Sequence, residues 1–99
     1  MLNIGKEANG SDMKIALEGR LDTVTAPELE EVVKTSLDGI GSLVFDFSKL
    51  EYISSAGLRV LLSAQKVMNK QGSMVVKNVS EEVAEIFEVT GFSDILTVE

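Results

Sequence analysis

The chain has 99 residues, about the usual size of one domain, and we interpret residues 1–99 as a single domain. Sixteen Asp and Glu against nine Lys and Arg give a formal net charge of −7, and such a surface repels nucleic acid and anionic lipid. With no Cys and no His, the chain lacks the residues of disulfides, thiolate metal sites and the commonest general base. We therefore expect no nucleic-acid or membrane partner, no metal and no cofactor.

The apolar residues come in runs of three at most, which is too short to span a bilayer. Residues 1–5 also lack the basic and apolar regions of a signal peptide. We therefore expect a cytoplasmic protein.

The N-terminal third predicts a hairpin followed by a helix. Residues 2–7 and 13–19 are typical of two strands around a turn at 8–12, because apolar and polar residues alternate in the second segment. Thr25 and Glu28 have the spacing of a capping box, which predicts a helix with Thr25 as its cap. Its apolar face recurs every three to four residues, from Leu29 to Leu37, and glycines end it.

The middle of the chain predicts a central strand, a helix and another strand. Residues 42–47 form a nearly continuous apolar run, typical of a strand that is buried on both faces. A second helix is expected over 56–69, ended by Gly72, and a short strand over 74–76. The inward side of this helix is expected to carry Leu58, Leu61, Leu62 and Gln65.

The C-terminal segment predicts a helix and a last strand. Ser80 is placed to cap the helix, with Glu81 and Glu82 in its first turn and Gly91 as its C-cap. Residues 95–98 are expected to form the last strand. The resulting order is β-β-α-β-α-β-α-β. Strands separated by helices indicate a small α/β domain with a mostly parallel central sheet, to which the N-terminal strand adds antiparallel at an edge.

Two polar loops carry the candidate functional residues. One is residues 20–24, after the second strand, and the other is residues 52–57, before the second helix. Because functional loops of α/β sheets gather outside the carboxyl ends of the strands, both should lie at one end of the sheet.

Ser54 and Ser55 stand where the second helix begins. One of them can cap this helix, and the other interpretation is a modifiable hydroxyl, because a phosphate is favoured at the positive end of a helix. Gly57 can serve close helix–sheet packing or the approach of another chain. Asp22 can stabilise its own loop or accept a hydrogen bond from a partner, whereas Asp46 suits a structural hydrogen bond at a strand end.

Catalytic motifs are absent from the sequence. Residues 53–57 lack the leading Gly of a nucleophile elbow, no His can activate a serine, and no glycine-rich phosphate loop is present. A Ser–Lys pair stays open, although no Lys lies near Ser55 in the sequence.

Two linked motifs carry a family resemblance. GRLDTVTAPEL at 19–29 and VFDFSKLEYISSAGL at 44–58 resemble the anti-sigma factor antagonists, the bacterial form of the STAS domain, and the similarity runs nearly end to end. The resemblance implies a STAS-like fold and a partner-switching protein that is not an enzyme. The unmodified antagonist binds an anti-sigma factor that is also a serine kinase and so frees the sigma factor. Phosphorylation releases the antagonist, and a PP2C-type phosphatase restores it.

Matched residue by residue, the resemblance places the phosphorylation site at Ser55, two positions before Gly57. Many relatives have Asp immediately before this serine, where this chain has Ser54, so Ser54 stays as the alternative site. The free protein is expected to be a monomer. The expected partner-binding residues are Asp22, Thr23, Ser54, Ser55, Gly57 and Arg59.

Two other functions are open at this stage. The same fold can serve as a scaffold subunit of a lipid transporter or of a multiprotein signalling complex, without a kinase cycle. A small hydrolase that uses Ser55 is the third hypothesis.

Overall fold

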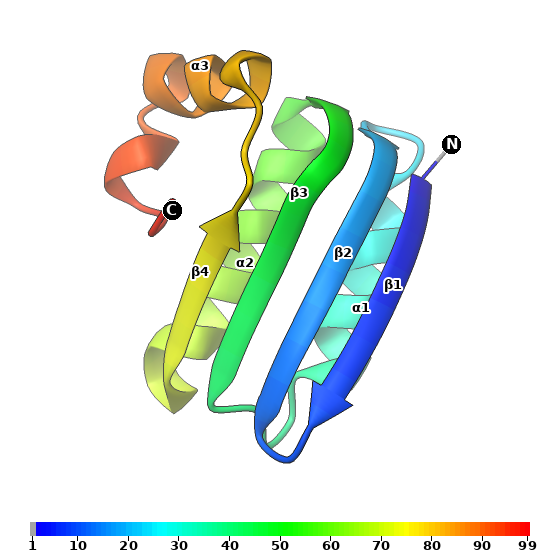
Figure 1. Cartoon of the computed structure of the whole chain (residues 1–99), viewed down its shortest axis with the longest axis vertical. Helices are drawn as coiled ribbons and strands as arrows, with labels where there is room; N and C mark the ends of the chain where they lie inside the picture. Colours follow the sequence, from blue (N-terminus) through cyan, green and yellow to red (C-terminus); the bar gives the residue numbers. More distant parts are fainter. Residues whose placement is uncertain (1) are drawn as a thin grey trace.

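The computed structural model describes residues 2–99, in which four strands form one mixed sheet in the order β1-β2-β3-β4 (Figure 1). Strand β1 pairs antiparallel with β2, and the pairs β2–β3 and β3–β4 are parallel. The predicted hairpin and the edge position of the first strand are confirmed. The strands are β1 Leu2–Asn9, β2 Asp12–Leu21, β3 Ser42–Ile53 and β4 Ser73–Lys77.

The helices pack on one side of this sheet. Figure 1 shows α1 and α2 lying side by side behind the strands, while α3 crosses beyond the end of β4. Among residues 2–99, none of the helices has both the length and the apolarity needed to cross a membrane. The helices are α1 Ala26–Ser36, α2 Ser55–Gln71, α3 Glu81–Thr90 and the short 3-10 helix η1 Phe92–Asp94.

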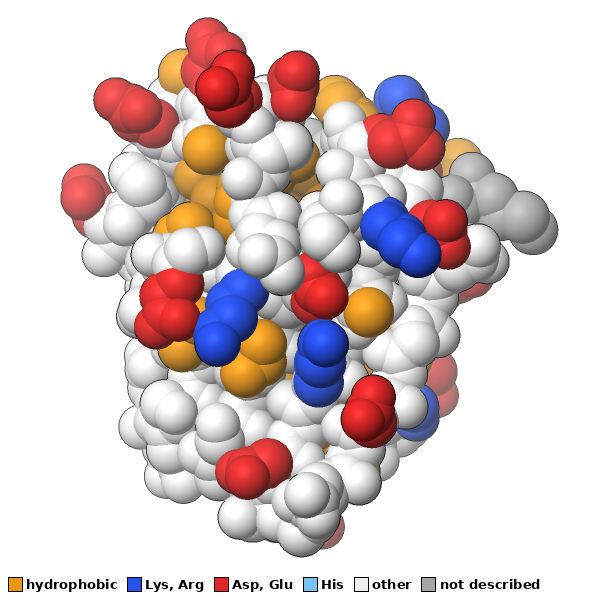
Figure 2. Space-filling model, in the orientation of Figure 1, with side chains coloured by type: hydrophobic (Ala, Val, Ile, Leu, Met, Phe, Trp, Pro, Cys, Tyr) orange, Lys and Arg blue, Asp and Glu red, His pale blue; other side chains and the backbone are white. Residues whose placement is uncertain are grey.

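The prediction that residues 42–47 are buried on both faces is wrong. Burial alternates along β3, with Leu43, Phe45 and Phe47 fully buried and Val44 and Asp46 only half-buried. The strand order explains this, because two right-handed crossovers that step in the same direction place both helices on the same face. The other face of the sheet is open to solvent, and Figure 2 looks onto it.

The core lies between the sheet and the helices. Phe47 of β3 contacts Phe45, with ring centroids 5.9 Å apart, and Phe87 of α3, at 6.4 Å. Ser80 caps α3 as predicted, since its Oγ accepts the N–H of Val83 at 3.2 Å. Gly91 ends α3 in the left-handed conformation, at φ 83°. The Phe47–Phe87 contact packs α3 against the middle of β3.

The predicted last strand at 95–98 is wrong. The 3-10 helix η1 takes up residues 92–94, and the chain then returns to β4 through a single parallel bridge between Val98 and Val76. The N–H of Val76 donates to the carbonyl of Thr97, and the N–H of Glu99 donates to the carbonyl of Val76, both at 2.8 Å. The N–H groups of Ile95 and Leu96 both donate to the carbonyl of Phe92, at 3.0 and 2.8 Å, so the turn that follows α3 continues into the residues expected to be extended.

Asp46 makes structural hydrogen bonds, as predicted, but it lies within β3 on the open face of the sheet and not at a strand end. Its Oδ1 accepts the backbone N–H of Ser48 at 3.0 Å and the Nδ2 of Asn78 at 3.1 Å, and its Oδ2 lies 3.7 Å from Lys14 Nζ. The bond from Asn78, followed by the bond from Ser48 and the charge of Lys14, lowers the pKa of Asp46 to about 2. The carboxylate therefore ties β3 to the residue that follows β4.

This pKa predicts how stability depends on pH. The pKa of Asp46 is lower in the folded chain than in the unfolded one, so its contribution to stability is complete above about pH 5 and is lost as the pH falls through about 2. Asp46→Asn should lower the free energy of unfolding by about 1–2 kcal/mol at pH 7. Urea titrations at pH 7 and pH 2.5 should show this gap closing in acid. A gap of the same size at both pH values would contradict the assignment.

Candidate functional site

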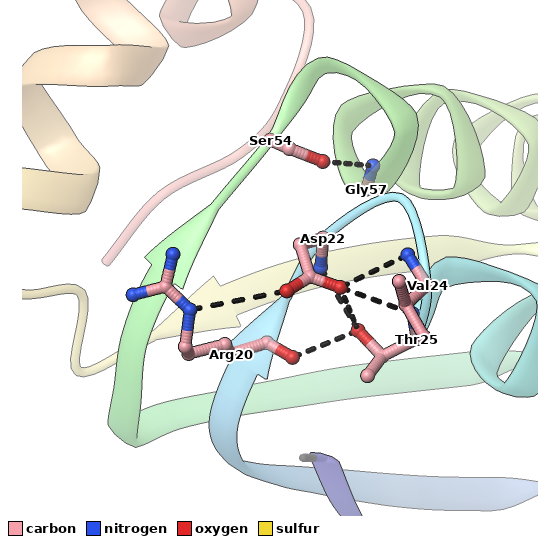
Figure 3. A network of polar contacts seen from close by, with 6 residues as sticks. All are labelled: Arg20, Asp22, Val24, Thr25, Ser54 and Gly57. Carbon is pink, nitrogen blue, oxygen red and sulfur yellow. Dashed lines mark hydrogen bonds and ion pairs between the residues drawn. The ribbon is translucent and has the colours of Figure 1, made fainter.

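The two candidate loops meet at one end of the sheet, as predicted, but both begin later than predicted, because residues 20–21 belong to β2 and residues 52–53 to β3. Leu21 and Ile53, the last residues of β2 and β3, are register partners in the parallel pair. The backbone N–H of Ser54 donates to the carbonyl of Leu21 at 2.9 Å, which joins the two loops directly. The loop before α1 and the first turn of α2 are therefore held side by side (Figure 3).

Asp22 holds the first loop in shape. Its Oδ1 accepts the backbone N–H groups of Val24 at 3.0 Å and Thr25 at 3.1 Å, and its Oδ2 lies 3.8 Å from Arg20 Nε (Figure 3). The bond from the Thr25 N–H contributes most to lowering the pKa of Asp22. The bond from Val24 and the charge of Arg20 lower it further, whereas the partial loss of hydration raises it. The structure thus confirms that Asp22 stabilises its own loop, while contact of Asp22 with a partner stays a prediction.

The prediction that the Thr25 side chain caps α1 is wrong. The backbone of Thr25 is already helical, and the N–H of Ala26 donates to the carbonyl of Asp22 at 2.8 Å. The Thr25 hydroxyl turns back from the helix: it donates to the carbonyl of Arg20 at 2.8 Å and accepts the N–H of Asp22 at 2.9 Å. Asp22 instead accepts the N–H groups just before α1, those of Val24 and Thr25.

The two serines at the start of α2 have different environments. Ser54 precedes the helix with an extended backbone and is half-buried, and its Oγ accepts the N–H of Gly57 over a long 3.5 Å (Figure 3). Ser55 is the first residue of the helix and is exposed. One serine of the pair therefore caps the helix, as the sequence indicated, and the other presents its side chain to solvent.

Gly57 is explained by packing inside the domain. The residue is buried, and a Cβ added to it would lie 2.7 Å from Leu21 Cγ and 2.9 Å from Ile53 Cγ1. The absent side chain lets α2 approach the ends of β2 and β3 closely. Of the six residues expected to contact a partner, Gly57 is the one that the structure buries, which supports the packing role, while its contact with a partner stays a prediction.

A shallow groove between α1 and α2 brings two other predicted residues together. Thr23 and Arg59 are both exposed and both line this groove, which has a volume of about 230 Å³. Pro27 of α1 and Ala56 of α2 also line it. Because Ala56 directly follows Ser55 in the helix, the groove adjoins the exposed serine.

The sequence reasoning did not single out two exposed side chains at this end of the sheet. Val24, at the tip of the Asp22 loop, is 81% exposed, and Tyr52, near the end of β3, is 37% exposed. The guanidinium of Arg20 lies over the Tyr52 ring, 4.5 Å from its centroid, in a cation–π contact between register partners. The sequence did carry a signal for Val24, because it is an apolar residue in a polar loop, between Thr23 and Thr25.

These features define a small α/β binding domain whose candidate site is an exposed, rigid surface at the carboxyl end of the sheet. The serine, the Asp22 loop and the groove all lie on elements held by backbone hydrogen bonds and by the bonds that the Asp22 carboxylate accepts. The chain belongs to the STAS domain family, whose model matches residues 3–99.

Named relatives and solved structures agree with this family. The chain is 39% identical over 84 residues to the BtrV protein of Bordetella bronchiseptica, covering 83% of this chain and 72% of the relative. It is 29% identical over 98 residues to the anti-sigma-B factor antagonist of Bacillus subtilis, covering 98% and 90%. The fold is similar to that of the anti-sigma factor antagonist SpoIIAA in its unphosphorylated form, with a TM-score of 0.77 at 17% identity over 98% of this chain and 87% of that chain. The phosphorylated form of SpoIIAA, at 17% identity, gives a TM-score of 0.76 and covers 98% and 91%.

Proposed function

We propose that this protein is an anti-sigma factor antagonist that works by partner switching in the cytoplasm. In the unphosphorylated state it binds an anti-sigma factor that is also a serine kinase, and this binding frees the sigma factor. The observation that carries the proposal is the exposed Ser55 at the start of α2, beside the rigid Asp22 loop. The name of the Bacillus subtilis relative and the two forms of SpoIIAA support it.

Ser55 is the proposed phosphorylation site. The kinase transfers the γ-phosphoryl group of ATP: a bond forms between Ser55 Oγ and the γ phosphorus, and the bond from that phosphorus to the β–γ bridging oxygen breaks. ADP leaves, and the hydroxyl proton passes to a base of the kinase. A PP2C-type phosphatase hydrolyses the phosphoserine and restores the binding form.

Phosphorylation can end binding without refolding the domain. Ser55 is exposed, and the backbone contacts that fix the site do not involve its side chain. A phosphate adds about −1.5 to −2 charges at pH 7, next to a surface that already carries Asp22. Such a charge in a fitted interface repels an acidic partner group and loses its own hydration. Thr23, Ser54 and Arg59 are the further proposed contact residues, and the free protein is proposed to be a monomer.

The serine assignment is tested by phosphorylation of matched variants. Incubation with the cognate anti-sigma kinase and ATP should add one phosphate to the wild type, and intact-mass measurement should find none on Ser55→Ala. Ser54→Ala is the matched control and should still be labelled, because Ser54 is the half-buried helix cap. Labelling of Ser55→Ala together with loss of labelling in Ser54→Ala would move the site to Ser54. Labelling of neither serine in the wild type would refute the kinase cycle.

A further inference from the structure

Arg59 lies one helical turn after Ser55 on the exposed side of α2. Both residues are exposed, and they are separated by four positions in the same helix. Residues four apart in a helix have Cβ atoms about 5–6 Å apart on one face. The long side chain of Arg59 can therefore reach a group carried by Ser55 without any change in the backbone.

Arg59 is also available for a new partner. Within residues 2–99 it takes part in no ion pair, whereas Lys14, Arg20, Lys34 and Lys77 are each paired with a carboxylate. Glu30 of α1 is the acidic residue that lines the groove with Arg59, and it lies 3.5 Å from Lys34 instead. The guanidinium is thus left without a neutralising group in a chain of net charge −7.

The first turn of α2 differs from those of the other two helices. It holds no acidic residue, whereas α1 has Glu28 and α3 has Glu81 and Glu82 in their first turns. A negative group on Ser55 would therefore meet no carboxylate within its own helical turn.

We propose that Arg59 is the positioning residue that holds the phosphate on Ser55, and this inference rests on the proposed function. In the unmodified chain the guanidinium faces the groove and is offered to the partner. In the modified chain the phosphate pairs with it, so phosphorylation both adds negative charge to the contact surface and withdraws its unpaired arginine. Arginine suits this role because its planar fork can donate two hydrogen bonds to phosphate oxygens.

The test is the second pKa of the phosphoserine, measured by ³¹P NMR titration. Phosphoserine is placed at position 55 by genetic encoding, so the measurement does not depend on any kinase. An ordinary phosphoserine has a second pKa of about 6. Arg59→Gln should raise the value by about half a unit relative to the wild type, as expected for one charge about 5 Å away in a solvated site. Asp22 and Glu30, the nearby carboxylates, are present in both proteins, so the difference isolates Arg59.

Two further variants separate a specific pair from a change in net charge. Lys66→Gln removes one positive charge from α2 at about 16 Å along the helix from Ser55, and it should leave the pKa within 0.1 unit, roughly the precision of such a titration. Arg59→Lys should restore part of the shift, because a single ammonium group replaces the fork.

Equal pKa values in the wild type and Arg59→Gln would overturn the pairing, and so would an equal shift in Lys66→Gln. Whether a kinase modifies Ser55 is decided separately by the labelling of the serine variants. Failure of the pairing and failure of the proposed function are therefore distinguishable.

Discussion

Gly72→Ala is expected to lower the free energy of unfolding by about 3 kcal/mol, the largest loss of stability predicted for a single substitution in this protein. Gly72 follows α2, and a Cβ added to it would overlap the carbonyl oxygen of Gly41 and lie 2.7 Å from the carbonyl carbon. The same carbonyl accepts the N–H of Ser73 at 3.0 Å, which brings the start of β4 beside the start of β3. Relief of the overlap has to separate these two segments, because the Cβ is fixed by the backbone of residue 72 and the atoms that it meets belong to the backbone of Gly41.

Gly41→Ala is the matched control for this prediction. Its added Cβ would lie 3.9 Å from Ser11 Oγ, an ordinary van der Waals distance, so its loss should stay below about 0.5 kcal/mol. Urea unfolding followed by circular dichroism measures both variants. If the Gly72 variant accumulates only as insoluble protein while the Gly41 variant is soluble, the order of the two effects still holds. Equal midpoints for the two variants would contradict the close approach of these segments.

The local elements of this fold were predictable because their signals lie close together in the sequence. The Ser80 cap and the Gly91 C-cap of α3 depend on residues within one turn of each helix end, and both are confirmed. The paired ends of β2 and β3 followed from the alternation of strands and helices, because parallel strands end at the same edge of a sheet.

The misplaced features depend on contacts that a local pattern does not contain. Burial of residues 42–47 on both faces required helices on both sides, and only the strand order decides that. The prediction of a strand at 95–98 failed because the N–H groups of Ile95 and Leu96 donate to the carbonyl of Phe92, which leaves a single bridge at Val98.

At the site, sequence reasoning found the residues but not how they divide their roles. Thr25 and Asp22 each have a side chain that can accept hydrogen bonds from the backbone N–H groups before α1. In the structure Asp22 accepts them, because the Thr25 hydroxyl donates to the carbonyl of Arg20 instead. Ser54 and Ser55 likewise could each cap α2, and only the extended backbone of Ser54 decides which one does. Gly57 needed the positions of Leu21 and Ile53 to be interpreted as a packing residue.

Ser55→Asp is expected to weaken binding to the proposed partner, an anti-sigma kinase, about a hundredfold, which corresponds to roughly 2.7 kcal/mol. The physical reason is a carboxylate that must lose its water in the interface, beside the charge already carried by Asp22. The domain itself should tolerate the change. Ser55 is exposed at the first position of a helix that lacks an acidic residue there, so the added charge should raise the free energy of unfolding by about 0.3–1 kcal/mol.

Ser55→Asn separates charge from shape, because it has nearly the same size as the aspartate variant and no charge. Its affinity should stay within about threefold of the wild type, since only the charge carries the predicted loss. Calorimetric titration gives the affinities, and thermal melting shows whether both variants keep the wild-type fold. Equal losses for Asp and Asn would make the effect steric, and unchanged affinity for both would place Ser55 outside the docking surface. Weaker binding together with a more stable domain is expected only if the added charge destabilises the interface and leaves the folded domain intact.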